Sequence, residues 1–158
     1  MSLVQETLSQ IRSVHEYFNR STRNLTEAHS AFVPAEGMMS AAQQVAHAAH
    51  TIDWFVEGAW RPEGFDMNWE EHAKIVGGYT SLAAARDWFE RAVAAAIAKV
   101  EASSDADLMV PLPEGPIMGG VPRVAVFGAI ADHTAHHRGA LTVYARLNGV
   151  VPPMPYMD

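Results

Sequence analysis

The sequence predicts an all-α protein of a single domain, residues 1–158, folded as a four-helix bundle. Four long segments carry apolar residues at the three- and four-residue spacing of a helix face. Connections that contain Pro and Gly separate them, and no run between turns alternates apolar and polar residues as a half-buried strand does. Four helices of this kind bury their apolar faces against one another in a bundle.

The first two predicted helices cover residues 2–29 and residues 40–58. Pro34 lies in the break between them, because proline removes a backbone donor and stops a helix. Ser40 and Gln43 match a capping box, in which both side chains satisfy free amides at the start of a helix.

The third predicted helix covers residues 81–101. It follows the longest connection, residues 60–80, inside which residues 68–71 could open a short helix.

The fourth predicted helix has Pro122 in its first turn, where the missing amide costs nothing, and stops before Gly149. Residues 105–120 before it are expected to be loop, since they are rich in Pro and Gly.

Charge and composition exclude several classes of protein. The net charge of −7 argues against a nucleic-acid or anionic-membrane partner, because phosphate binding relies on clustered Lys and Arg. With no cysteine, the chain has no disulfide, catalytic thiol or thiolate metal site. The N-terminal segment lacks the apolar core of a signal peptide, and no apolar run approaches the roughly 18 residues of a membrane span. We therefore expect a cytoplasmic protein that binds neither nucleic acid nor membrane.

Two histidines in the fourth helix are the most informative feature of the sequence. His133 and His137 lie four residues apart, one turn above the other on the apolar face of that helix. Two buried imidazoles in that arrangement need a common partner, and a transition metal is the partner that both can bind. His136 points roughly 80° away on the helical wheel and is interpreted as a flanking residue.

The second helix offers a third imidazole. No charged residue occurs from position 38 to position 52, so this helix is expected to be covered on most sides. Its polar, uncharged face carries both His47 and His50, and periodicity does not choose between them.

A site of three imidazoles suits one divalent transition metal, Zn²⁺, Ni²⁺ or Fe²⁺, and the affinity trend alone does not select among these. The Glu-x-x-His pairs of di-iron bundles are absent, which favours a single ion. Three protein ligands would also leave positions for water or substrate, as in catalytic sites.

The C-terminal motif resembles that of a known family. The His-x-x-His-His-Arg-Gly run at 133–139, its continuation at 141–149 and the tail with Pro152 and Pro153 look like the signature of the DinB-like (DinB/YfiT) superfamily. Residues 40–54 resemble that family's second helix, with one key histidine.

This resemblance implies a four-helix bundle with a long crossover connection, commonly a homodimer, that holds one divalent metal. Carried over by position, the three ligands are His47, His133 and His137. Many relatives have Gln where this chain has Ala140, so the resemblance supports no role at that position. Some relatives resemble transferases or isomerases that use a low-molecular-weight thiol such as bacillithiol or mycothiol.

Three hypotheses are therefore weighed. The first is a metal-dependent enzyme, of S-transferase, isomerase or hydrolase type, that activates an external low-molecular-weight thiol or water for reaction with a small-molecule substrate. The alternative is a non-catalytic, stress-associated dimer that binds metal, or a plain bundle that acquires metal only during purification. No catalytic residue is assigned.

Other side chains near the motif have simpler interpretations. Tyr144 and Trp54 are interpreted as core residues, with a place in the pocket lining as the alternative for Trp54. Arg138 is interpreted as one partner of a helix ion pair, with Asp132 for example, or as a bridge to a neighbouring helix. The connections 60–80 and 105–120 are expected to border a pocket, and the candidates for its apolar wall are Trp60, Trp69 and Met118.

Overall fold

The computed structural model describes residues 2–157, and its regular structure is helical. The elements in chain order are α1 (Leu3–Thr22), the 3₁₀ turn η1 (Glu27–His29), α2 (Ala41–Trp60), α3 (Trp69–Gly77), α4 (Leu82–Glu101), α5 (Asp105–Leu108) and α6 (Ala125–Leu147). Within the described residues, β-pairing is limited to an isolated bridge between Pro111 and Pro122. The predicted all-α class is confirmed.

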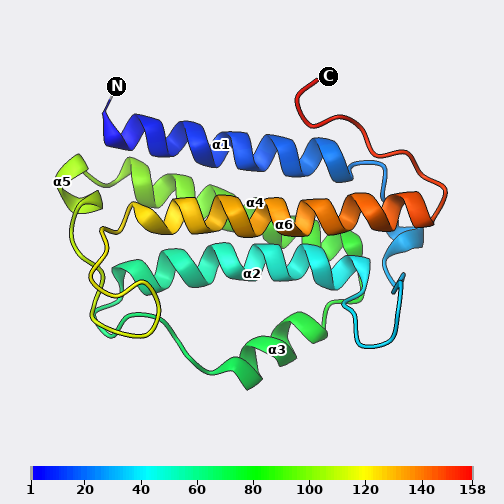
Figure 1. The fold of residues 1–158 in the computed structure, drawn as a ribbon, viewed down its shortest axis with the longest axis horizontal. Helices are drawn as coiled ribbons and strands as arrows, with labels where there is room; N and C mark the ends of the chain where they lie inside the picture. The colour runs from blue at the N-terminus through cyan, green and yellow to red at the C-terminus, as the bar shows by residue number, and fades with distance from the viewer. Residues whose placement is uncertain (1, 158) are drawn as a thin grey trace.

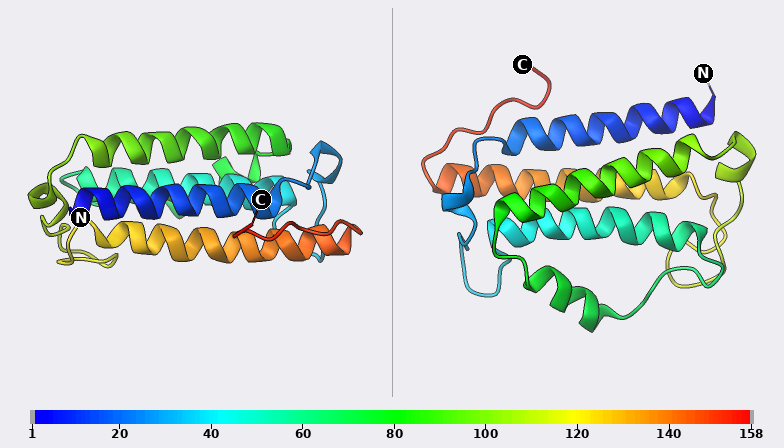
Figure 2. Two further views of the ribbon diagram at one scale, coloured as in Figure 1. Left: turned by 90° about the horizontal axis from the view of Figure 1, so that it is seen from above. Right: turned by 180° about the vertical axis from the view of Figure 1, so that it is seen from behind.

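Four long helices form the bundle (Figure 1). Helices α1 and α6 run in one direction, and α2 and α4 run in the other (Figures 1 and 2). Helix α2 packs against α4 and α6, and α1 packs against the same two helices. Because α2 and α4 are parallel, the chain between them must return along the length of the bundle, and α3 lies in this long crossover.

Helix α1 is shorter than the periodicity predicted. It ends at Thr22, and the chain turns before η1. The guanidinium of Arg86, on α4, donates to the carbonyl oxygens of Thr22 at 2.6 Å and Leu25 at 3.3 Å. A side chain from another helix thus satisfies carbonyls that a longer α1 would have bonded internally.

The start of α6 also differs from the prediction. Pro122 lies three residues before the helix, in a turn where Arg123 and Val124 donate backbone hydrogen bonds to Val110 and Leu108. The predicted loop contains the short helix α5. At the other end the prediction is confirmed, because Gly149 follows the helix with a φ of +73°.

Helix α2 is the most enclosed of the long helices. Its capping box forms as predicted, with the Gln43 amide N–H donating to Ser40 Oγ and the Ser40 amide N–H donating to Gln43 Oε1. A row of small side chains is fully buried: Ala41, Ala42, Val45, Ala46, Ala48 and Ala49. Small residues let α4 and α6 approach closely, which brings the polar face of α2 against α6 and α3.

Near its C-terminal end, α2 also receives the chain that leads to α3. A Cβ atom at Gly58 would lie 2.1 Å from the ring of Phe65, so this ring can pack on the helix only because position 58 has no side chain. Among the described residues, the length and apolar character needed to cross a bilayer are found in no helix.

Candidate metal centre

Three histidines from two helices meet inside the bundle. His47 lies on α2, and His133 and His137 lie one turn apart on α6. Each offers a ring nitrogen, and the three nitrogens lie within 4.8 Å of one another. Nε2 of His133 is 3.2 Å from Nε2 of His137. The ring centroid of His47 is 5.0 Å from that of His133 and 4.8 Å from that of His137.

The neighbouring histidines do not join this cluster. His136 is exposed, as the helical phase of α6 predicts. His50 lies on the same helix as His47, but its Nε2 pairs with Nδ1 of His72, on α3, at 3.1 Å. Of the two residues that periodicity left open on α2, the structure therefore brings His47 to the α6 pair.

Burial makes the three imidazoles neutral. Burial, with a smaller effect from the neighbouring histidines, lowers the pKa of His137 to about 3 and that of His133 to about 4 from the usual 6.5. Burial also lowers the pKa of His47, with a smaller effect from His136. At neutral pH each ring therefore keeps a free lone pair, which is the form of imidazole that binds a metal.

A hydrogen-bond chain orients one ring of the cluster. Nδ1 of His137 donates to Oε1 of Gln44, so the lone pair of His137 is on Nε2, the atom nearest His133. Nε2 of Gln44 donates to the Tyr144 hydroxyl at 3.2 Å, and this hydroxyl donates to the carbonyl of Met39 at 2.9 Å. Partners of this kind set the tautomer and orientation of metal-binding histidines.

Sequence reasoning missed this role of Gln44 and took Tyr144 as a core residue. The core assignment holds, since Tyr144 is 2% exposed and packs edge-on against Phe32, but its hydroxyl also belongs to the chain. The signal was present in the spacing. Gln44 precedes His47 by three residues and Tyr144 follows His137 by seven, so each shares a helix face with a histidine of the cluster.

The donor set fits a divalent transition metal. No carboxylate or thiolate belongs to the group, and neutral imidazole suits Zn²⁺, Ni²⁺ and Fe²⁺ alike. Nδ1 of His133 is buried with no hydrogen-bond partner among the described residues. An unsatisfied buried nitrogen costs on the order of 1–3 kcal/mol, so folding stability alone does not account for this histidine.

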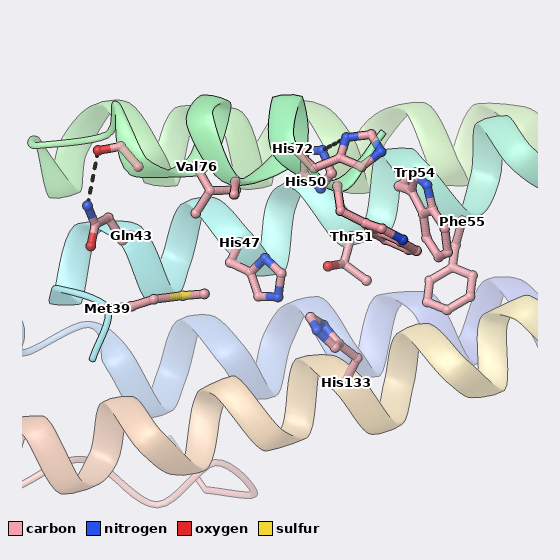
Figure 3. Close-up of a pocket in the computed structure, with 13 residues that line it drawn as sticks. Met39, Gln43, His47, His50, Thr51, Trp54, Phe55, His72, Val76 and His133 are labelled. Atoms are coloured by element: carbon pink, nitrogen blue, oxygen red, sulfur yellow. Dashed lines mark hydrogen bonds between the residues drawn. The ribbon is translucent and has the colours of Figure 1, made fainter. Parts of the chain in front are cut away.

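A cavity of about 480 Å³ opens beside the cluster, between α2, α3 and α6 (Figure 3). His47 and His133 face each other across one side of it, and α3 covers the other (Figure 3). Its lining consists of Met39, Gln43, His47, His50, Thr51, Trp54, Phe55, Trp69, His72, Ala73, Val76, Gly77 and His133. The polar, uncharged face of α2 thus lines a pocket.

The prediction of which residues form the apolar wall of the pocket is partly wrong. Trp69 lines the cavity, but Trp60 packs under the side chains of Lys99 and Arg123, and neither Met118 nor any other residue of 105–120 reaches it. Trp54, interpreted from the sequence as core, is half-buried and lines the cavity.

Arg138 of the C-terminal motif lies away from this cavity. Its guanidinium is 5.8 Å from the centroid of Tyr17, on α1, so it bridges to a neighbouring helix.

Comparison with known proteins identifies the family. A family model described as the DinB superfamily matches residues 10–141, a span that contains all three histidines of the cluster. The chain belongs to the DinB superfamily. Among curated proteins, none matches it.

Two solved structures share the DinB fold. A DinB-like protein from Bacillus cereus ATCC 10987 aligns with a TM-score of 0.70 and 18% identity, over 96% of this chain and 93% of its own. A DinB-like protein from Bacillus subtilis aligns with a TM-score of 0.59 and 20% identity, over 96% of this chain and 94% of its own. At these identities the likeness concerns the fold alone.

Proposed function

We propose that this DinB superfamily protein is a metal-dependent enzyme in which His47, His133 and His137 hold one divalent transition metal, zinc, nickel or iron. The proposed reaction is of S-transferase, isomerase or hydrolase type, with a low-molecular-weight thiol or water as nucleophile. One observation carries the proposal: two of the three clustered histidines line a cavity large enough for a small molecule. A site that only stabilised the bundle would have no need of such a cavity.

The chemistry divides between the ion and the chain. When bound, the ion would supply Lewis acidity, which lowers the pKa of a thiol or water so that the anionic nucleophile is available near neutral pH. Gln44 holds the ring of His137 in one tautomer. Apolar side chains of α2 and α3 form much of the cavity lining, and a substrate bound against them would displace water, which strengthens electrostatic interactions inside the cavity.

Metal content, stability and turnover together test the proposal. Untagged protein should contain about one equivalent of metal by mass spectrometry, because three-histidine sites bind without a purification tag. Chelation should lower the melting temperature only slightly, and the loaded protein should conjugate monochlorobimane, a general electrophile, with one cellular thiol or hydrolyse a small substrate.

Other outcomes would overturn this proposal. A large loss of melting temperature on chelation without any turnover would assign the ion to structure. Metal found only in protein purified on a nickel column would show that the ion comes from the column, and the proposed metal site would be wrong.

We also propose that the chain acts in the cytoplasm as a homodimer. Apolar side chains at the end of α6 and just beyond it are exposed, with Val143 at 53%, Leu147 at 60% and Val151 at 79%. A second copy would cover this surface. Light scattering should give twice the mass of one chain, and Leu147→Glu should reduce it; a single-chain mass for the unmodified protein contradicts the proposal.

A further inference from the structure

The cavity beside the histidine cluster has no Asp, Glu, Lys or Arg side chain in its lining. The nearest cation on α3, Lys74, points to solvent and pairs with Glu71 at 3.7 Å. In the metal-free protein, a ligand anion inside the cavity would therefore lose its hydration and gain no cationic partner, which is unfavourable.

Most polar groups of the lining are already used by the protein. Nε2 of Gln43 donates to the carbonyl of Gly77 at 3.0 Å, and Nε1 of Trp54 donates to the carbonyl of Asp66 at 2.7 Å. These bonds connect α2 to both ends of residues 66–77, the segment that contains α3.

A third tie joins the two segments between these ends. His50 pairs with His72 at 3.1 Å, and Nε2 of His72 donates to the same Asp66 carbonyl at 3.1 Å. The polar groups left for a ligand are therefore the Thr51 hydroxyl and the side that holds His47 and His133.

Aromatic rings line the part of the cavity away from the histidine cluster. The Trp54 ring centroid lies 5.0 Å from that of Phe55 and 5.6 Å from that of Trp69. Trp69 is 53% exposed, so a large part of this residue remains open to contact with a ligand. A flat apolar ligand would cover it and contact the other two rings.

We propose that this cavity selects an uncharged small molecule with a flat apolar body and one polar head. The body lies against Trp54, Phe55 and Trp69, and the head points to His47 and His133. The placement of the head rests on the proposed metal site, whereas the selection against charge rests on the lining alone. The charged body of a cellular thiol stays outside, so the cavity is the site of the apolar substrate.

A matched pair of fluorescent dyes tests the selection against charge. N-phenyl-1-naphthylamine and 1-anilinonaphthalene-8-sulfonate share the same rings and differ by one sulfonate. The neutral dye should bind the metal-free protein at one equivalent per chain and at least about tenfold more tightly than the sulfonate. Equal or tighter binding of the sulfonate dye overturns the proposed selection against charge.

A charge introduced by mutation tests whether the preference for the neutral dye arises in this cavity. Ala73 lines the cavity from α3 and is exposed, so Ala73→Arg adds a cation at the wall without disturbing the core. It should reduce the preference for the neutral dye at least about tenfold. Ala94→Arg, at an exposed position of α4 that is not part of the cavity lining, adds the same charge and should leave the preference unchanged. If both variants behave alike, the dyes bind elsewhere and the inference is wrong.

Displacement of the neutral dye tests the head group. In zinc-loaded protein, phenylmethanethiol should displace the dye at a concentration at least about tenfold lower than toluene, which has nearly the same body and no head. In metal-free protein the two should differ little. Equal displacement from the loaded protein contradicts the placement of the head.

The two proposals can fail separately. Retained metal with no discrimination between the dyes overturns the inference about the cavity and leaves the metal site standing. Discrimination between the dyes in a protein that retains no metal overturns the proposed function and leaves the selection against charge standing.

Discussion

The side-chain oxygen of Gln44 accepts a hydrogen bond from Nδ1 of His137 across the contact between α2 and α6. Gln44 is 8% exposed and His137 is 5% exposed, so water does not compete for this bond. It joins the two helices that carry the histidine cluster and presents the lone pair of His137 to the site.

Removal of the Gln44 side chain should weaken metal binding. In Gln44→Ala, the ring of His137 loses the partner that sets its tautomer, and loss of such partners typically costs about 10- to 100-fold in affinity. Competition with a chelator of known zinc affinity measures the effect. Gln43→Ala is the control, because Gln43 bonds Gly77 and Ser40 and should change stability without changing affinity. Equal affinities in all three proteins would show that Gln44 has no such role.

Individual histidine substitutions should separate the cluster from its neighbours. His47→Ala, His133→Ala and His137→Ala should each abolish metal retention, since two imidazoles hold a divalent ion much more weakly than three. His136→Ala and His50→Ala should retain it, because His136 is exposed and His50 pairs with His72. Metal analysis after dialysis gives the result. Loss in His50→Ala with retention in His47→Ala would reverse the assignment on α2.

The metal-free protein should lose stability in acid. The folded-state pKa is about 4 for His133 and about 3 for His137, below the usual 6.5 of the unfolded chain, so the unfolded state takes up protons first. The contribution of these two histidines to the free energy of unfolding is complete above pH 6.5 and is lost as the pH falls from 6.5 towards 3. Urea midpoints at pH 7, 6 and 5 follow this loss.

A variant isolates the contribution of one histidine. His133→Asn cannot titrate in this range, so its urea midpoint should fall less between pH 7 and pH 5 than that of the unmodified protein. Parallel curves for the two proteins would assign the acid sensitivity to other groups.

Gly58→Ala should destabilise the protein, because the added methyl group would overlap the ring of Phe65. Overpacking of this kind costs about 1–3 kcal/mol. Gly128→Ala on α6 is the control, since a Cβ there meets nothing within 4 Å and alanine is the better helix former. Urea denaturation compares the two. A neutral Gly58→Ala would mean that the segment before α3 shifts without cost.

Local signals determined much of this protein from its sequence. The Ser40 capping box marks the start of α2, Gly149 follows the end of α6, and the four-residue spacing of His133 and His137 puts both rings on one face. Each of these features depends on residues within one or two helical turns, so periodicity and capping chemistry suffice to read them.

Tertiary structure decided what depends on distant residues. Arg86, on α4, bonds the carbonyl of Thr22, where α1 ends. The packing of α2 between α3 and α6 places His50 beside His72 and places His47 in the cluster. The same packing places Gln44 against His137. Periodicity gives the face of a helix on which a side chain lies, whereas its partner is set by the neighbouring helix, and that choice is made only when the bundle assembles.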